Sequence, residues 1–89
     1  MTEKRYEAKI NGYWYPVKII GRRDLFPMFP VVDVGVKIFR AWDRRVAHAY
    51  PFCTYSMGGP VDSDCGWVRE KSIRETTDDP LTTVYPKKS

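Results

Sequence analysis

Apolar and polar residues alternate on both sides of an Asn11-Gly12 dipeptide near the start of the chain. Asn and Gly both tolerate the positive φ of a two-residue type I′ turn, so the dipeptide predicts a β-hairpin. This turn sets the strand register, with Ile10 opposite Tyr13 and successive pairs following from it. One face of the hairpin then carries six apolar side chains, namely Tyr6, Ala8, Ile10, Tyr13, Tyr15 and Val17. We expect that face to cover a core.

A second alternating run spans residues 32–38 and places Val or Ile at every other position. Branched side chains and a period of two predict a strand with one buried face. Between the two runs, residues 21–30 contain two X-Pro steps and the pair Arg22-Arg23, which together predict a loop. Phe26 and Phe29 give this loop an unusual amount of apolar surface. We therefore expect the loop to fold over one end of the sheet or to contact a partner.

The second half of the chain has weaker patterns. Residues 41–45 predict a turn, and alternation over 46–52 predicts a third strand that bends at Pro51. The Gly-Gly-Pro and aspartate content of 56–66 predicts a loop. We expect a short strand over 65–70, a helical turn over 70–74, a β-prone segment over 81–85 and a frayed tail over 86–89. The fold class is therefore predicted to be all-β and antiparallel, with little helix.

The length of 89 residues fits one domain, which we assign to residues 1–89. Hydrophobic residues make up 43% of the chain and aromatic residues 15%, which is typical of a folded core rather than a disordered chain. A domain of this size buries only about 60% of its unfolded surface, so an enclosed active-site cleft would use much of that core. The size favours binding over catalysis, and we expect no enzymatic activity.

The net charge of +4 is distributed unevenly along the chain. Residues 1–45 hold ten basic and five acidic side chains, whereas residues 46–89 hold five and six. This asymmetry favours an anionic partner for the first half, although an ordinary solvated surface also accounts for it. The pairs Arg22-Arg23 and Arg44-Arg45 are the most basic points, but they flank opposite ends of the predicted 32–38 strand. We therefore expect them to lie in separate sites.

No metal or cofactor site is predicted. His48, Cys53 and Cys65 do not have the spacing of common zinc ligands, and no phosphate-binding loop or nucleophile motif occurs. The chain has no basic-then-apolar leader and no apolar run of about 18 residues, so we expect a cytoplasmic protein without membrane contact. Its two cysteines are then expected to be reduced thiols, with a Cys53–Cys65 disulfide as the alternative.

The tryptophans provide candidate binding residues. The hairpin register points Trp14 outward, away from the core face, and places Lys9 opposite it on the neighbouring strand. Lys18 follows on the same outward face. Trp14 or Trp42, each with a neighbouring tyrosine, could form the wall of a site for a cation or a stacked base. Packing of all the tryptophans in the core or at its ends is the alternative.

The chain resembles the Tudor-type SH3-like barrels. The residues that carry the resemblance are Tyr6-Glu7-Ala8-Lys9, the Asn11-Gly12 turn, Trp14-Tyr15-Pro16-Val17-Lys18-Ile19, the alternating 32–38 strand and a closing turn over 67–74. The resemblance implies a five-stranded antiparallel barrel or strongly bent sheet. It also implies a binding function, with Trp14 and Tyr15 as the counterparts of the aromatic cage residues in that family.

These observations predict an interaction module that binds a partner protein or peptide, or an identical subunit to form a homodimer. Nucleic-acid binding by the basic first half is the alternative function. The candidate binding residues are Lys9, Trp14, Lys18, Arg22, Arg23, Phe26, Phe29, Trp42, Arg44 and Arg45.

Overall fold

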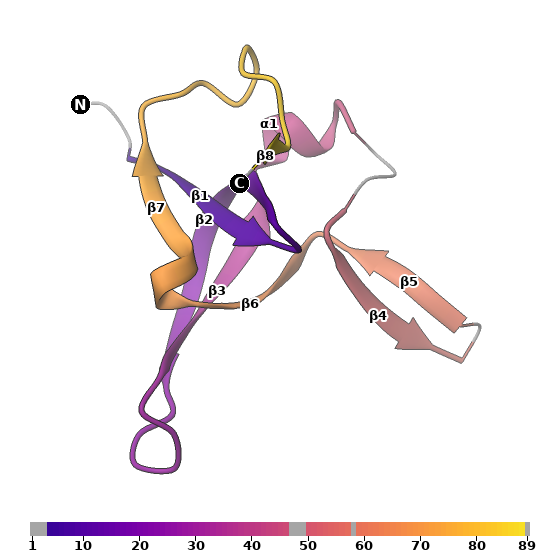
Figure 1. The fold of residues 1–89 in the computed structure, drawn as a ribbon. Coiled ribbons are helices and arrows are strands. Elements are labelled where there is room, and N and C mark those ends of the chain that lie inside the picture. The colour runs from indigo at the N-terminus through magenta and orange to yellow at the C-terminus, as the bar shows by residue number, and fades with distance from the viewer. Residues whose placement is uncertain (1–3, 47–49, 58, 89) are drawn as a thin grey trace.

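The computed structural model describes residues 4–46, 50–57 and 59–88 (Figure 1). Its main sheet has the strand order β6-β3-β2-β1-β7, and the short strand β8 pairs with β2 beside this path. The strands of this sheet are β1 (Arg5–Ile10), β2 (Tyr13–Asp24), β3 (Val32–Ile38), β6 (Cys65–Arg69), β7 (Ile73–Thr76) and β8 (Lys87–Lys88). All of the pairings are antiparallel. The predicted all-β class with little helix is therefore confirmed.

The first hairpin forms as the sequence predicted. Asn11 and Gly12 have φ values of 54° and 85°, which are the left-handed angles that the turn requires. Ile10 pairs with Tyr13, and the register continues to the pair of Tyr6 with Val17. On the outer edges of this hairpin, β1 pairs with β7 and β2 pairs with β3.

The second hairpin is longer than predicted. Strand β2 continues to Asp24 and pairs with β3 along most of its length, with a bulge between Ile19 and Gly21. Arg22 and Arg23 therefore lie in a strand, and their prediction as loop residues was wrong. The sequence did not predict this extension of β2, because the bulge breaks the alternation of apolar and polar residues along the strand. The β3–β6 ladder ends at the pair of Asp33 with Arg69, and beyond it residues 24–32 project away from the rest of the molecule (Figure 1). We call this segment the arm.

The core lies on one face of the main sheet. Its buried residues are Ala8, Ile10, Val17, Val34, Val36, Ile38 and Trp42. Trp42 belongs to the short helix α1 (Arg40–Asp43), which follows β3 where the sequence predicted a turn. Within the described residues, no ladder joins β6 to β7, so the sheet is open rather than a closed barrel. The 3₁₀ helix η1 (Glu70–Ser72) connects these two strands where a helical turn was predicted.

The region between α1 and β6 differs from the prediction. The predicted 46–52 strand is wrong at Val46, Tyr50 and Pro51, because the strand β4 (Phe52–Ser56) begins only at Phe52. The predicted 56–66 loop is also wrong, since β5 (Gly59–Ser63) pairs with β4 in a separate two-stranded sheet. The predicted strand over 65–70 is confirmed as β6. His48, which belongs to the predicted strand, lies outside the described residues.

The C-terminal segment returns across the sheet (Figure 1). After β7 the chain turns at 79–83, and Lys87 and Lys88 then pair with Trp14 and Tyr13 as β8. The prediction of a frayed tail is therefore wrong at Lys87 and Lys88. No described helix has both the length and the apolar character needed to cross a bilayer.

Candidate interaction surface

The loop at the end of the arm, residues 25–30, is held in one shape by backbone hydrogen bonds. The Leu25 N–H donates to the Val31 carbonyl over 3.1 Å, and the Phe29 N–H donates to the Leu25 carbonyl over 3.0 Å. The Asp24 carboxylate accepts a further bond of 2.9 Å from the Phe26 N–H. We call residues 25–30 the tip. These bonds make the tip a preorganised structure.

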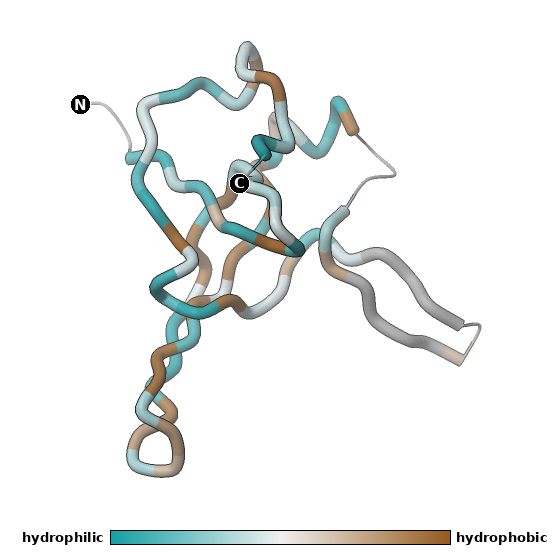
Figure 2. The backbone as a smooth tube through the Cα atoms, viewed as in Figure 1, coloured by the Kyte–Doolittle hydropathy of each residue, from teal (hydrophilic) through white to brown (hydrophobic). Residues whose placement is uncertain are grey.

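The tip exposes most of its apolar surface. Phe26 is 72% exposed, Met28 82% and Phe29 58%. Leu25 is half-buried, and both tip prolines are exposed. Figure 2 shows the tip as an apolar to neutral loop beyond an arm in which hydrophilic and hydrophobic residues alternate. Phe26 and Phe29, both candidate binding residues, are thus exposed, and the expectation that this loop folds over one end of the sheet is wrong (Figure 1).

A tryptophan that was not among the candidates lies at the base of the arm. Trp67 of β6 pairs with Gly35, which in turn pairs with Gly21. A β-carbon at Gly35 would lie 3.4 Å from the Trp67 ring, and one at Gly21 would lie 3.7 Å from it. The two glycines therefore provide a flat floor for the indole. Trp67 remains 48% exposed above this floor.

Acidic partners hold the arginines around the base of the arm. The Arg23 guanidinium stacks on the Trp67 ring at 4.4 Å and lies 3.3 Å from the Asp33 carboxylate. Asp33 also accepts a 2.7 Å bond from Arg69. Arg22, on the opposite face of β2, forms an ion pair with Glu70 of η1. Arg22 and Arg23 thus lie on opposite faces of β2, and each arginine has a carboxylate partner.

Trp14 does not form the exposed site that the sequence suggested. It is half-buried, and the cation stacked on it is Arg74 of β7 at 3.9 Å, rather than Lys9. Lys9 lies opposite Trp14 in register and is exposed. Lys18 lies over the Phe39 ring at 5.0 Å. The predicted outward orientation of Trp14 holds, but the strand β7 and the C-terminal segment cover much of it.

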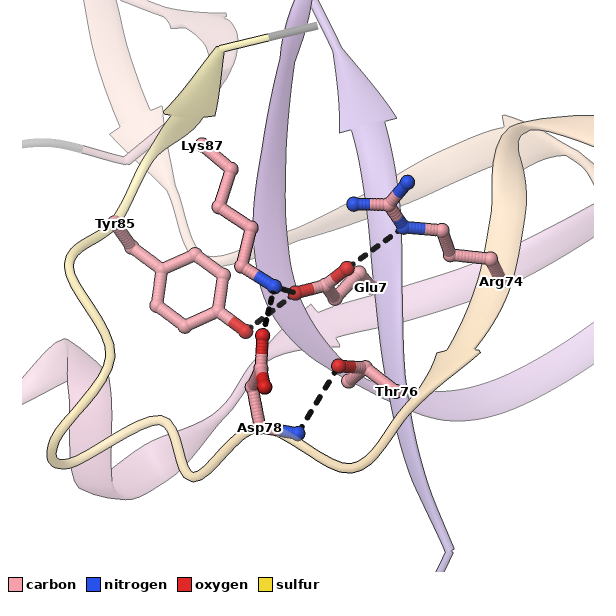
Figure 3. Close-up of polar contacts among 6 residues, drawn as sticks. All are labelled: Glu7, Arg74, Thr76, Asp78, Tyr85 and Lys87. Atoms are coloured by element: carbon pink, nitrogen blue, oxygen red, sulfur yellow. Dashed lines mark hydrogen bonds and ion pairs between the residues drawn. The ribbon is translucent and has the colours of Figure 1, made fainter.

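Beside Trp14, a buried carboxylate anchors the C-terminal segment to the outer face of the sheet (Figure 3). Glu7 of β1 is fully buried. It accepts a 2.8 Å bond from Arg74 Nε and a 2.6 Å bond from the Tyr85 hydroxyl, and it forms an ion pair with Lys87. Lys87 also contacts Asp78. All the polar groups at the centre of this cluster have partners.

The cluster shifts the titration of its members. Burial raises the pKa of Glu7, but the hydrogen bonds from Lys87, Tyr85 and Arg74 outweigh it, and the pKa lies below its ordinary value. Burial and the Glu7 hydrogen bond together raise the pKa of Tyr85. Burial lowers the pKa of Lys87, whereas its bonds to Asp78 and Glu7 raise it, with a net rise. At neutral pH the charged Glu7 carboxylate, the charged Lys87 ammonium group and the neutral Tyr85 hydroxyl therefore fix the C-terminal segment.

The groove beside this cluster, of about 810 Å³, is lined mainly by charged side chains. Lys4 pairs with Glu75 over 3.4 Å, and Arg74 and Lys87 bind Glu7. With Arg5 and Asp78 included, the groove is lined by four cations and three anions, and ion pairs join most of them. An excess of one positive charge gives the groove no strong preference for a charged ligand.

Two of the remaining candidates, Trp42 and Arg45, stabilise the fold. Trp42 is buried and packs edge-on against Tyr15 at 5.9 Å and Tyr85 at 6.3 Å, so its prediction as a binding wall was wrong. Arg45 donates 2.8 Å hydrogen bonds to the carbonyls of Pro80 and Leu81 and holds the turn before β8. Its neighbour, Arg44, is exposed after α1.

Cys65 is an exposed free thiol, and the side chain of Cys53 lies outside the described part of the structure. Among the side chains that the structure describes, no group of three His, Cys, Asp or Glu residues could hold a metal ion.

The candidate surface thus consists of the tip and, at the base of the arm, Trp67 with Arg23. Sequence reasoning missed Trp67 because its glycine floor depends on the pairing of Gly21 with Gly35, and Gly21 was assigned to a loop. Comparisons with protein family models, curated proteins and solved structures found no match to this chain.

Proposed function

We propose that this chain is a non-enzymatic interaction module that binds a partner protein through the tip of its arm. One observation carries the proposal: Phe26, Met28 and Phe29 are exposed on a loop that hydrogen bonds hold in shape. Burying one such side chain contributes a free energy of roughly 1.5–3 kcal/mol. Because these side chains stay exposed, folding of the chain obtains little of this free energy. Binding to a partner with an apolar pocket would obtain it, and the fixed tip would lose little conformational entropy on binding.

Trp67 and Arg23 extend this proposed surface along the arm. Tryptophan and arginine are enriched among the residues that dominate binding energy at protein interfaces. The glycine floor and Asp33 already fix the two side chains, so a partner need not order them.

Nucleic-acid binding has less support. Each of the arginines near the arm has an acidic partner: Arg22 binds Glu70, while Arg23 and Arg69 share Asp33. Phosphate contacts would have to replace these ion pairs. A protein partner for the tip requires no such exchange.

We also propose that the fold belongs with the Tudor-type SH3-like barrels. The strand order β6-β3-β2-β1-β7 and the position of η1 between β6 and β7 support this assignment. The open sheet, the long arm and the added β4-β5 hairpin are departures from the expected pattern. Trp14 and Tyr15 already contact Arg74 and Trp42, which favours the tip over an aromatic cage as the binding surface. The exposed thiol of Cys65 fits the proposed cytoplasmic location.

Site-specific photo-cross-linking tests the protein-binding proposal. A photoreactive phenylalanine analogue replaces Met28 in the tip, or Val84 as a control, because Val84 is apolar, 84% exposed and far from the tip in sequence. We expect the probe at position 28 to form discrete protein adducts in an extract of the source cells or with the purified chain. Phe29→Ser should reduce these adducts. Adducts of equal yield from position 84, or none from position 28, would contradict the proposal.

A further inference from the structure

A second apolar feature of the molecule lies at the base of the arm, where a cavity of about 240 Å³ opens. Four of its lining residues have large apolar or aromatic side chains, and four are charged. They are Tyr6, Ile19, Val34 and Ile73, with Arg22, Glu70, Arg74 and Glu75. We call this cavity the base pocket.

The base pocket exists because the core ends before the arm begins. Val17 and Ile19 share the core-facing side of β2, yet Val17 is 2% exposed and Ile19 is 44% exposed. β1 pairs with β2 only as far as Val17, so it does not cover Ile19. An apolar side chain on a core-facing position is thereby left partly exposed beside a cavity.

We propose that the base pocket receives a tip phenylalanine from a second copy of this chain, so that two copies exchange tips. The inference rests on the proposed function and identifies the partner protein as an identical subunit. A dry apolar cavity on the order of 150 Å³ can hold a benzene ring. The base pocket therefore has room for one phenyl ring, and its Ile19 and Val34 side chains offer that ring apolar contacts.

The charged residues of the base pocket also suit a phenyl ring. Arg22 and Glu70, which both line the pocket, form an ion pair with each other. Their charges are thereby satisfied without a contribution from the ligand, so an uncharged ring can enter without leaving them unpaired. The ring could also lie against the Arg22 guanidinium, which is favourable for aromatic faces.

The positions of tip and pocket permit a reciprocal, two-fold arrangement. Ile19 and Phe26 are seven positions apart on the same hairpin, which corresponds to about 23 Å of extended strand. Two arms lying side by side in opposite directions would each bring a tip to the other copy's base pocket. Such an arrangement is closed, because both tips and both pockets are occupied within one pair of copies, and it stops at the dimer.

Sedimentation equilibrium of the full chain over about 1 µM to 1 mM tests the inference. We expect a monomer–dimer equilibrium. The tip variant Phe26→Ser/Phe29→Ser and the pocket variant Ile19→Lys should each weaken dimerisation at least tenfold. Val84→Ser removes a similarly exposed apolar side chain elsewhere and should leave it unchanged. Ile19→Ala replaces the lysine variant if thermal melting shows that the latter is unfolded.

Mixing the two variants tests reciprocity. The pocket variant retains an intact tip, and the tip variant retains an intact pocket, so their heterodimer has one complete contact. An equimolar mixture should therefore dimerise more strongly than either variant alone. A monomeric wild-type chain at every concentration, an unaffected pocket variant, a mixture no stronger than its components or open-ended polymers would each overturn the inference. A monomeric chain whose tip still cross-links to a different protein would overturn only this inference and leave the proposed function intact.

Discussion

At the scale of single residues, Glu7 shows how one buried charge fixes a distant segment. Its carboxylate is fully buried and is bound by Arg74, Tyr85 and Lys87. A buried charge is tolerated only with such partners, and losing it leaves those partners unsatisfied. The sequence predicted Glu7 on the outward face of the hairpin. It did not predict that Glu7 is buried. The residues that cover Glu7 lie about 70 to 80 positions later in the chain, where the alternation of apolar and polar residues is weak.

We expect Glu7→Gln to lower the free energy of unfolding by about 2 kcal/mol at neutral pH, because hydrogen bonds to a charged group contribute roughly 1.5–3 kcal/mol. Glu75→Gln is the matched control. Glu75 pairs with Lys4 at an exposed site, where such a pair contributes less than about 1 kcal/mol. Urea-induced unfolding of both variants measures the difference. Equal losses would show that the Glu7 network does not stabilise the fold.

The same residue predicts a pH dependence. The pKa of Glu7 in the folded chain lies below its ordinary value of 4.5, so its stabilising contribution is present above that value. It is lost as the pH falls through the lowered pKa. Because Gln does not titrate, we expect the stability difference between the wild type and Glu7→Gln to shrink as the pH falls from about 7 to about 3. A difference that stays constant over this range would contradict the assignment.

At the scale of elements, the sequence predicted local turns but not the pairing of strands that lie far apart along the chain. Asn11-Gly12 specified both the turn and the register of the first hairpin. In the second hairpin, the bulge at Ile20 interrupts the alternation, and the Arg22-Arg23 pair looked like loop composition. The pairing with β3 overrides that local signal. The sequence did not predict β8 for the same reason. Lys87 and Lys88 pair with Trp14 and Tyr13, and the Lys87 side chain forms an ion pair with Glu7.

The first turn provides a test that isolates backbone conformation. A β-carbon at Gly12 would meet nothing within 4 Å, so a substitution there causes no clash. Its φ of 85° nevertheless strains a branched side chain. We expect Gly12→Val to destabilise the chain by about 1–3 kcal/mol and Gly12→Asn to cost clearly less, since Asn tolerates positive φ. Thermal melting compares the two, and equal melting temperatures would rule out backbone strain as the cause.

At the scale of the whole molecule, the charge asymmetry of the sequence does not persist in space. Acidic residues of the second half meet basic residues of the first: Glu70 binds Arg22, Asp64 binds Lys37 and Glu75 binds Lys4. The candidate surface also depends on contacts between distant segments. The sequence predicted the apolar content of the tip. It did not predict that the tip projects from the body, nor the base pocket or the glycine floor under Trp67, because these features depend on how β2 and β3 extend past the core.

These ion pairs predict weak contact with nucleic acid that depends only moderately on salt concentration. Each phosphate contact contributes a slope of about −0.9 in the logarithm of affinity against the logarithm of salt concentration. With Arg22, Arg23 and Arg69 held by carboxylates, we expect two such contacts or fewer. Affinity for a labelled DNA duplex should then fall by no more than about tenfold between about 50 and 200 mM salt, as measured by fluorescence anisotropy.

Releasing the arginines should reverse this behaviour. Asp33→Asn/Glu70→Gln frees the three guanidinium groups, so we expect tighter DNA binding and a steeper salt dependence. Asp43→Asn/Asp79→Asn makes the same change in net charge without removing a partner of these arginines, and it should have a smaller effect because phosphate contacts depend on local rather than total charge. If the wild-type chain already loses a thousandfold in affinity over this salt range, the arginines are available to phosphate despite their partners. The basic first half, rather than the apolar tip, would then be the principal binding surface.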